Sequence, residues 1–179
     1  MISASKSAAP MGLALDQLVF RAETAADDAA IEAIHATAFG PGRYARTAFR
    51  IREGVAADAR TSMVATFGNE VVGSVRLTRI DIGDTPALLL GPLAVLADLR
   101  GQGIGKALMR LSLDAARRCN HKLVLLVGDL PFYWQFGFRV VPADVVAMPG
   151  PVDPGRLLWA ELVPGAAEGV RGAVRAHRA

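Results

Sequence analysis

Cysteine and histidine are scarce in this chain. Cys119 is the one cysteine among 179 residues, which excludes a disulfide within the chain and a metal site built from several cysteines. The small number of histidines (His35, His121 and His177) argues against a metal enzyme that uses a histidine cluster. The sequence therefore predicts a protein that uses no metal.

Long apolar runs are also missing. The longest apolar stretch, residues 87–97, contains Gly91 and Pro92 and falls well short of the ~20 residues that a membrane-spanning helix needs. The first residues hold one lysine and a short apolar patch that ends at Asp16, whereas a secretory signal needs a longer apolar region and a cleavage site. We therefore expect a cytoplasmic protein with no membrane partner, in which residues 1–17 form a flexible leader.

The chain has little net charge. Charged residues make up 21% of it and apolar residues 52%, which argues against disorder and favours one domain with a sizeable core. The formal net charge of +3 raises the possibility of an acidic partner such as nucleic acid. However, three arginines and one glutamate in residues 165–179 account for two of these three charges. Because the aromatic and basic pattern of a nucleic-acid-binding surface is absent, we expect a basic, frayed tail over 164–179 and no nucleic-acid partner.

Hydrophobic periodicity predicts an α/β domain over residues 18–163. The segment 81–86 reads as a loop. Gly91-Pro92 interrupts an apolar strand, and because proline cannot donate a hydrogen bond to a neighbouring strand, we expect a bulge or splay there. The expected helices are 24–38, 43–52, 104–119 and 131–136, and the expected strands are 18–21, 62–67, 71–77, 87–95, 122–127, 138–141 and 156–162.

A glycine-rich loop, RGQGIG at residues 100–105, lies between an apolar strand and the most amphipathic helix. Glycines let backbone N–H groups converge on a ligand, and the start of a helix adds a partial positive charge, so the loop is suited to a phosphate or pyrophosphate. A Walker A loop is excluded because Arg100 and Ala107 stand where it needs glycine and Ser or Thr, and a dinucleotide fingerprint is excluded by Lys106. The alternative is a tightly packed turn that binds nothing.

Two motifs together resemble the GNAT superfamily of N-acyltransferases. Arg100-x-x-Gly103-x-Gly105 is similar to the coenzyme A pyrophosphate loop of that family, and residues 133–138 (YWQFGF) are similar to its tyrosine-to-Gly-Phe segment. The resemblance implies a single α/β domain with a mixed central sheet of about six to seven strands, flanked by helices, with a splayed central strand. Many family members carry asparagine near Gly128-Asp129, and this departure is compatible with Asp129 simply beginning the short helix that follows.

The resemblance also implies a coenzyme site. The pantetheine arm would pair with backbone groups of residues 93–95 as an added strand does, and N–H groups of the loop would hold the pyrophosphate. The residues expected to bind acetyl-CoA are Leu93, Ala94, Val95, Arg100, Gly101, Gln102, Gly103, Ile104, Gly105 and Lys106.

Catalytic roles follow from the same resemblance. The N–H group of Val95 would donate to the thioester oxygen as it becomes an oxyanion, and Tyr133 would protonate the departing thiolate. The alternative for Tyr133 is a core aromatic residue, since its segment is apolar all round. Arg43 and Tyr44 are candidates to contact the acceptor or the coenzyme, with an exposed amphipathic helix as the alternative. His35 reads as a half-buried structural histidine, and candidates for a general base by residue type alone are Glu53, Glu70, Asp81 and Asp84.

The expected function is an N-acetyltransferase that moves an acetyl group from acetyl-CoA, as co-substrate, to a primary amine on a small molecule or a protein. The amine would attack directly in a ternary complex, and the resemblance allows a homodimer. The alternative is a non-catalytic acyl-CoA-binding sensor or regulatory module.

Overall fold

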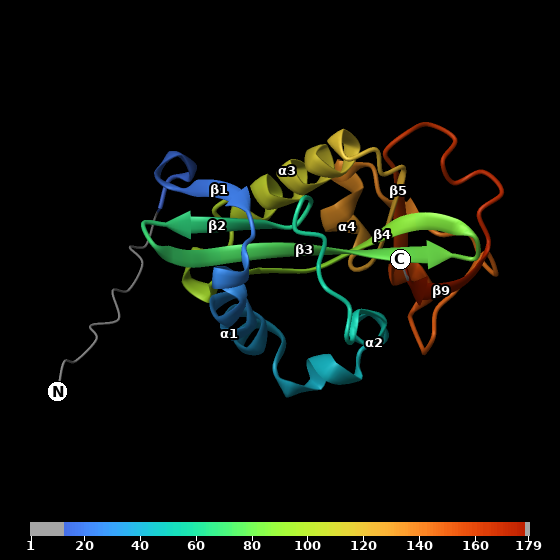
Figure 1. The fold of residues 1–179 in the computed structure, drawn as a ribbon, viewed down its shortest axis with the longest axis horizontal. Helices are drawn as coiled ribbons and strands as arrows, with labels where there is room; N and C mark the ends of the chain where they lie inside the picture. Colours follow the sequence, from blue (N-terminus) through green and yellow to red (C-terminus); the bar gives the residue numbers. More distant parts are fainter. Residues whose placement is uncertain (1–12, 178–179) are drawn as a thin grey trace.

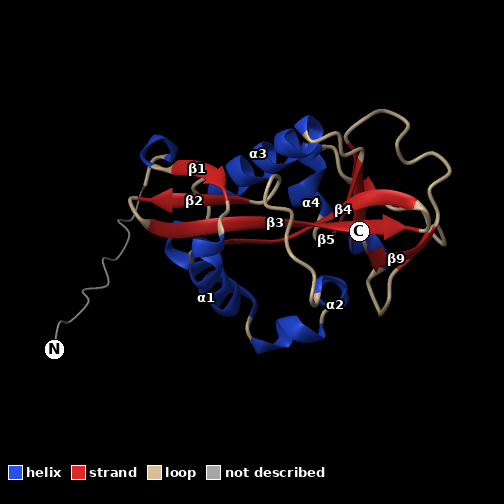
Figure 2. Cartoon of the chain, in the orientation of Figure 1, coloured by secondary structure: helices blue, strands red, loops and turns tan. Residues whose placement is uncertain are grey.

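The computed structural model describes residues 13–177, which form one sheet with helices on both faces (Figure 1). Helices α1 (Asp28–Phe39) and α2 (Thr47–Arg52) lie on one side, and α3 (Ile104–Arg118) and α4 (Leu130–Tyr133) lie on the other (Figure 2). The strands are β1 (Val19–Ala22), β2 (Met63–Phe67), β3 (Glu70–Ile82), β4 (Thr85–Val95), β5 (Leu123–Val127), β6 (Arg139–Val140), β7 (Val146–Ala147), β8 (Leu157–Glu161) and β9 (Gly172–Ala176).

The sheet is mixed, as the sequence predicts. Its main path runs β1-β2-β3-β4-β5-β8-β6, and β9 joins β3 to β7, which brings the sheet to nine strands. The pairs β4–β5 and β7–β9 are parallel, and the other pairs are antiparallel. Helix α3 is the crossover that a parallel β4–β5 connection requires.

The segment 81–86 is a tight hairpin rather than the expected loop. Ile82 pairs with Thr85, so β3 and β4 continue on either side of a turn formed by Gly83 and Asp84. Gly83 has a φ of +58°, a left-handed conformation that glycine adopts without a steric penalty. The loop prediction was wrong because Asp81 and Thr85, although polar, lie on strands that the hairpin holds in register.

Strand β4 is splayed where the sequence predicts it. Leu77 pairs with Leu90 while Val75 pairs with Leu93, so β4 carries one extra residue opposite β3 at this point. The parallel pairing of β4 with β5 covers only Leu88 and Leu89 and stops before Gly91. The two central strands therefore separate beyond residue 90, and the edge of β4 over residues 91–95 is left without β5.

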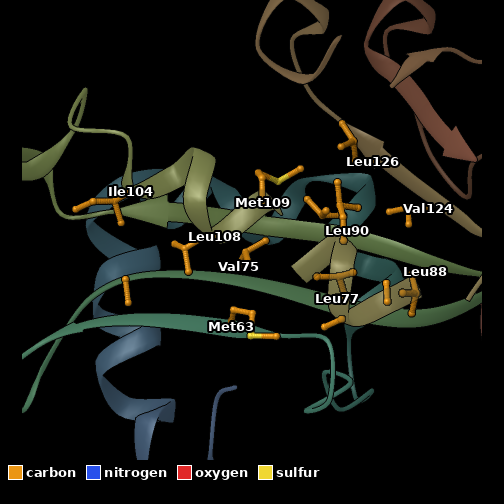
Figure 3. Packing of buried hydrophobic residues seen from close by; sticks show 14 of the residues in the cluster. Met63, Val75, Leu77, Leu88, Leu90, Ile104, Leu108, Met109, Val124 and Leu126 are labelled. Carbon is orange, nitrogen blue, oxygen red and sulfur yellow. The ribbon is translucent and has the colours of Figure 1, made fainter. Parts of the chain in front are cut away.

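Helix α3 packs its apolar stripe on the sheet beside the splay. Ile104, Leu108 and Met109 are at most 1% exposed and contact side chains of β2 to β5 (Figure 3). A Cβ atom on Gly73 of β3 would lie 3.2 Å from the Leu108 Cδ1 atom, so glycine lets the helix approach the sheet closely. This packing fixes the start of α3, and hence the glycine loop, against the end of β4.

The C-terminal segment is an ordered strand, which corrects the expected frayed tail over 164–179. Ile80 pairs with Ala176 and Ile82 with Val174, and the Val174 side chain is 4% exposed. The physical reason is that β3 is longer than β2, so its last residues would otherwise present an open edge. Residues 178–179 lie outside the described chain.

The expected flexible leader, residues 1–17, is corrected for its last residues. Leu13 is 3% exposed and belongs to the main core, and Leu15–Gln17 form a 3₁₀ turn. Residues 1–12 lie outside the described part of the chain. Within residues 13–177, none of the helices combines the length and the apolar character that crossing a membrane demands.

Candidate active site

A cavity of about 490 Å³ lies between the end of β4 and the start of α3. It brings together nine of the ten residues expected to bind the coenzyme: Leu93, Ala94, Val95, Arg100, Gly101, Gly103, Ile104, Gly105 and Lys106. The exception is Gln102, whose Nε2 donates to the Asp98 carbonyl oxygen at 3.4 Å. Phe39, Leu99 and Phe132 also line the cavity, and no pattern in the sequence separates them from ordinary core residues. That the ten expected residues bind the coenzyme stays a prediction.

The glycine loop has the conformation that its composition predicts. Gly101 and Gly103 have φ values of +80° and +87°, and Gly103 is the residue before α3. The first N–H groups of an α-helix have no partner inside it and carry the positive end of the helix dipole. Arg100 and Lys106 add formal positive charge on the same lining. The loop therefore forms a site that is suited to an anionic group.

The splayed edge of β4 presents backbone groups to this cavity. The N–H of Leu96 donates to the Val72 carbonyl at 2.9 Å, which makes these two residues a hydrogen-bonded antiparallel pair. Backbone groups alternate in direction along an antiparallel strand, so those of Leu93 and Val95 face away from β3, while those of Ala94 face β3. Leu93 and Val95 can therefore pair with an extended ligand arm, and the N–H of Val95 is available as a donor.

Tyr133 ends α4, and its ring packs edge-on against Phe132 with 4.9 Å between ring centroids. A Cβ atom on Gly128 would lie 2.3 Å from the Tyr133 Cε2 atom, so glycine at position 128 leaves room for the ring. Burial, reinforced by the Asp129 carboxylate, raises the pKa of Tyr133 to about 12. The phenol therefore keeps its proton at neutral and moderately alkaline pH.

Asp129 is the residue before α4, as the sequence allows, and its carboxylate also lies 3.1 Å from the Arg156 Nε atom. Asp129 thus forms an ion pair with Arg156 in addition to preceding the helix.

A second cavity, of about 940 Å³, lies on the other side of the splay. Its lining includes Tyr133, both acceptor candidates Arg43 and Tyr44, and one of the four base candidates, Glu53. The two cavities share Phe39 and Leu93. Tyr133 and the expected acceptor residues therefore line the same cavity. The end of β4, which both cavities contact at Leu93, separates that cavity from the glycine loop.

The other base candidates lie away from both cavities. Asp81 is hydrogen-bonded to the His177 Nδ1 atom at 2.9 Å on the β3–β9 side, and Glu70 and Asp84 lie at hairpin turns. Within residues 13–177, no group of three or more His, Cys, Asp and Glu side chains is arranged to hold a metal ion.

His35 is more buried than its pattern predicts and lines the second cavity. Its side chain on α1 lies 3.1 Å from the Ser74 hydroxyl of β3, and the residue is 3% exposed. Burial, followed by the positive charges of Arg76, Arg52 and Arg43, lowers the pKa of His35 to about 4. The imidazole is therefore neutral at pH 7 and joins α1 to the sheet.

Known proteins share this arrangement. Residues 58–140 match the family model of the acetyltransferase (GNAT) domain. The crystal structure of the GNAT family N-acetyltransferase YhbS from Escherichia coli, in complex with CoA, matches with a TM-score of 0.77 and 27% identity, covering 90% of each chain. These matches support a GNAT superfamily acetyltransferase. The mixed central sheet flanked by helices matches the fold of these GNAT neighbours.

Further GNAT relatives have similar lengths. The uncharacterized N-acetyltransferase YjhQ of Escherichia coli is 25% identical over 136 residues, which cover 74% of this chain and 75% of YjhQ. A GNAT family acetyltransferase from Brucella melitensis, solved in complex with acetyl-CoA, is 28% identical with a TM-score of 0.60 and covers 79% of this chain and 94% of that one.

Proposed function

We propose that this GNAT protein is an N-acetyltransferase that transfers the acetyl group of acetyl-CoA directly to a primary amine in a ternary complex. The observation that carries the proposal is the pair of cavities that meet at Leu93 and Phe39. One is lined by the glycine loop and the other by Tyr133. The CoA and acetyl-CoA complexes of the two solved relatives support the same co-substrate.

The residues of this chain fit the reaction. The amine nitrogen forms a bond to the thioester carbonyl carbon, and the bond from that carbon to sulfur then breaks. The N–H of Val95 stabilises the oxyanion that forms in between, because it faces the cavity and has no partner strand there. Tyr133 keeps its proton until the thiolate leaves and then donates it to sulfur. The carboxylates of Glu32 and Glu53 line the acceptor cavity from which the amine proton must depart.

A screen of amine acceptors with acetyl-CoA, followed by thiol release and with calorimetric titration of acetyl-CoA, tests the proposal. We expect acetyl-CoA to bind, and at least one amine to release thiol. Gly103→Trp should abolish binding because its side chain would fill the loop. The matched control is Gly68→Trp, which places the same residue at another left-handed glycine, in the β2–β3 turn, with open space around it.

Three results would contradict the proposal. The intact protein could fail to bind acetyl-CoA, or Gly103→Trp could bind it as tightly as the unchanged chain. Binding without turnover of any amine in the panel would identify a sensor of acyl-CoA instead.

A further inference from the structure

Arg52 is a partly buried cation in the acceptor cavity with few hydrogen-bond partners. It is the last residue of α2, and its Nε atom is buried and has no hydrogen-bond partner within residues 13–177. Its Nη2 atom makes one long contact, 3.4 Å to the Leu90 carbonyl oxygen. No carboxylate of the described chain lies within ion-pair distance of its guanidinium. Four of its five N–H groups therefore have no hydrogen-bond partner within residues 13–177.

Three of the four other arginines of the cavity have acidic partners. Arg76 forms ion pairs with Glu23, at 2.9 Å, and with Asp28, and Arg156 lies 3.1 Å from Asp129. Arg43 lies 3.8 Å from Glu32. The fourth, Arg46, forms no ion pair within residues 13–177 either, but it is exposed and its guanidinium lies over the ring of Phe39. Among the arginines that line the cavity, Arg52 is therefore the one that is both largely buried and without an acidic partner.

Burying an unpaired cation destabilises a fold, because the charge loses its hydration without a compensating partner. The same burial lowers the pKa of Arg52 to about 10. An unpaired arginine that destabilises the fold in this way is expected where a bound anion compensates the charge. A guanidinium can donate two parallel hydrogen bonds to a carboxylate.

Arg52 lies close to the proposed reaction site. A Cβ atom on Gly91 would lie 3.1 Å from Nη2, so glycine lets the guanidinium lie against the splayed strand. Gly91 is two residues before Leu93, which both cavities share, and Tyr133 lines the same cavity. An anion on Arg52 would thus lie beside the place where the acceptor amine must meet the thioester.

We infer that Arg52 binds a carboxylate of the acceptor, so the acceptor is an amino acid or another small amine that also carries a carboxylate. This inference rests on the proposed N-acetyltransferase function. A carboxylate matches the single charge of the Arg52 guanidinium and can accept two parallel hydrogen bonds from it, whereas a phosphate monoester carries close to two negative charges at neutral pH.

Matched amines test the inference. The pairs are glycine and glycinamide, L-alanine and L-alaninamide, and L-phenylalanine and L-phenylalaninamide, with O-phosphoethanolamine and ethanolamine as the phosphate arm. We expect kcat/KM, expressed per unprotonated amine, to be at least tenfold higher for the acid of a pair that is acetylated. Arg52→Gln should remove that preference, because it should lower kcat/KM for the acid at least tenfold more than kcat/KM for the amide. Arg50→Gln, an exposed position on the same helix, should retain it.

The inference is overturned if amides are preferred, if O-phosphoethanolamine is preferred to every carboxylate, or if Arg52→Gln keeps the preference for acids. Should Arg52→Gln fail to fold, Arg52→Lys keeps the charge without the paired N–H groups and should reduce the preference severalfold. An unchanged preference in that variant also overturns the inference.

Binding separates the inference from the proposed function. If no amine is acetylated, the same pairs are titrated calorimetrically into the protein with CoA present. Tenfold tighter binding of an acid than of its amide, lost in Arg52→Gln, supports the carboxylate site while the acetyl transfer fails. Equal binding within every pair, or no binding of any acid, overturns the carboxylate site.

Discussion

At the scale of single residues, the site depends on two glycines that leave space for larger neighbours. Gly128 leaves room for the ring of Tyr133, and Gly91 leaves room for the guanidinium of Arg52. In both cases the glycine, which has no side chain, leaves the space that the larger side chain occupies. A sequence motif that specifies only the larger residue does not predict these two glycines.

Tyr133→Phe gives the residue-scale prediction. Removing the hydroxyl removes the proposed donor to the leaving thiolate and leaves the ring packing unchanged, so kcat should fall about tenfold to a hundredfold. The affinity for acetyl-CoA should change less than about threefold, because Tyr133 lines the other cavity. Steady-state kinetics and calorimetry check both parts. Equal turnover of the variant and the unchanged chain at every pH would remove the acid role.

At the scale of elements, β3 organises the molecule. Its first half pairs with β2 and its last residues pair with β9, while β4 pairs with it along the other edge. This long strand carries Gly73 against α3, Ser74 against His35 of α1, and the register shift that splays β4. The two cavities are therefore positioned by one strand.

The pairing of β9 predicts that the C-terminal segment contributes to stability. Val174→Asp would bury an unpaired carboxylate in the core cluster, so the free energy of unfolding should fall by about 3 kcal/mol or more. Ala173→Asp is the matched control, because Ala173 is the exposed neighbour on the same strand, and it should cost less than about 1 kcal/mol. Urea unfolding measures both values. Equal stability of the two variants would mean that the tail is frayed after all.

At the scale of the whole molecule, stability should depend on pH through His35. The pKa of His35 is lowered from its usual 6.5 to about 4, so the unfolded chain binds a proton that the folded chain does not. The stabilisation is present in full above pH 6.5 and is lost progressively as the pH falls towards 4. The expected loss is about 2–3 kcal/mol by pH 4.5.

Urea unfolding at pH 7 and pH 4.5 measures this dependence. His35→Gln keeps a polar group near Ser74 but cannot titrate, so the difference in stability between the variant and the unchanged chain should depend on pH by that amount. A difference that is the same at both pH values would show that His35 does not carry the titration. Asp27 and Asp58, whose pKa values are lowered by their arginine partners, lose their contribution at lower pH in both proteins.

The sequence by itself determined the resemblance to the GNAT superfamily, the main helices and strands up to residue 141, the glycine loop and the splay of β4. These features are local. A glycine loop between a strand and an amphipathic helix, or a proline within a strand, predicts the same local structure whatever the tertiary fold. The nine expected residues that line the cavity of about 490 Å³ were predictable because they all lie within 93–106, a short stretch of chain.

The tertiary structure alone decided the acceptor side and the place of the last strand. Arg52, His35 and Arg76 line one cavity although 41 positions separate the first of them from the last along the chain. Their burial and their partners follow from long-range packing, which periodicity does not encode. A short segment such as 172–176 (GAVRA) becomes a strand only because β3 leaves an edge for it. Local patterns thus identified the glycine loop, whereas the packing of the sheet placed Arg52 where no carboxylate of residues 13–177 pairs with it.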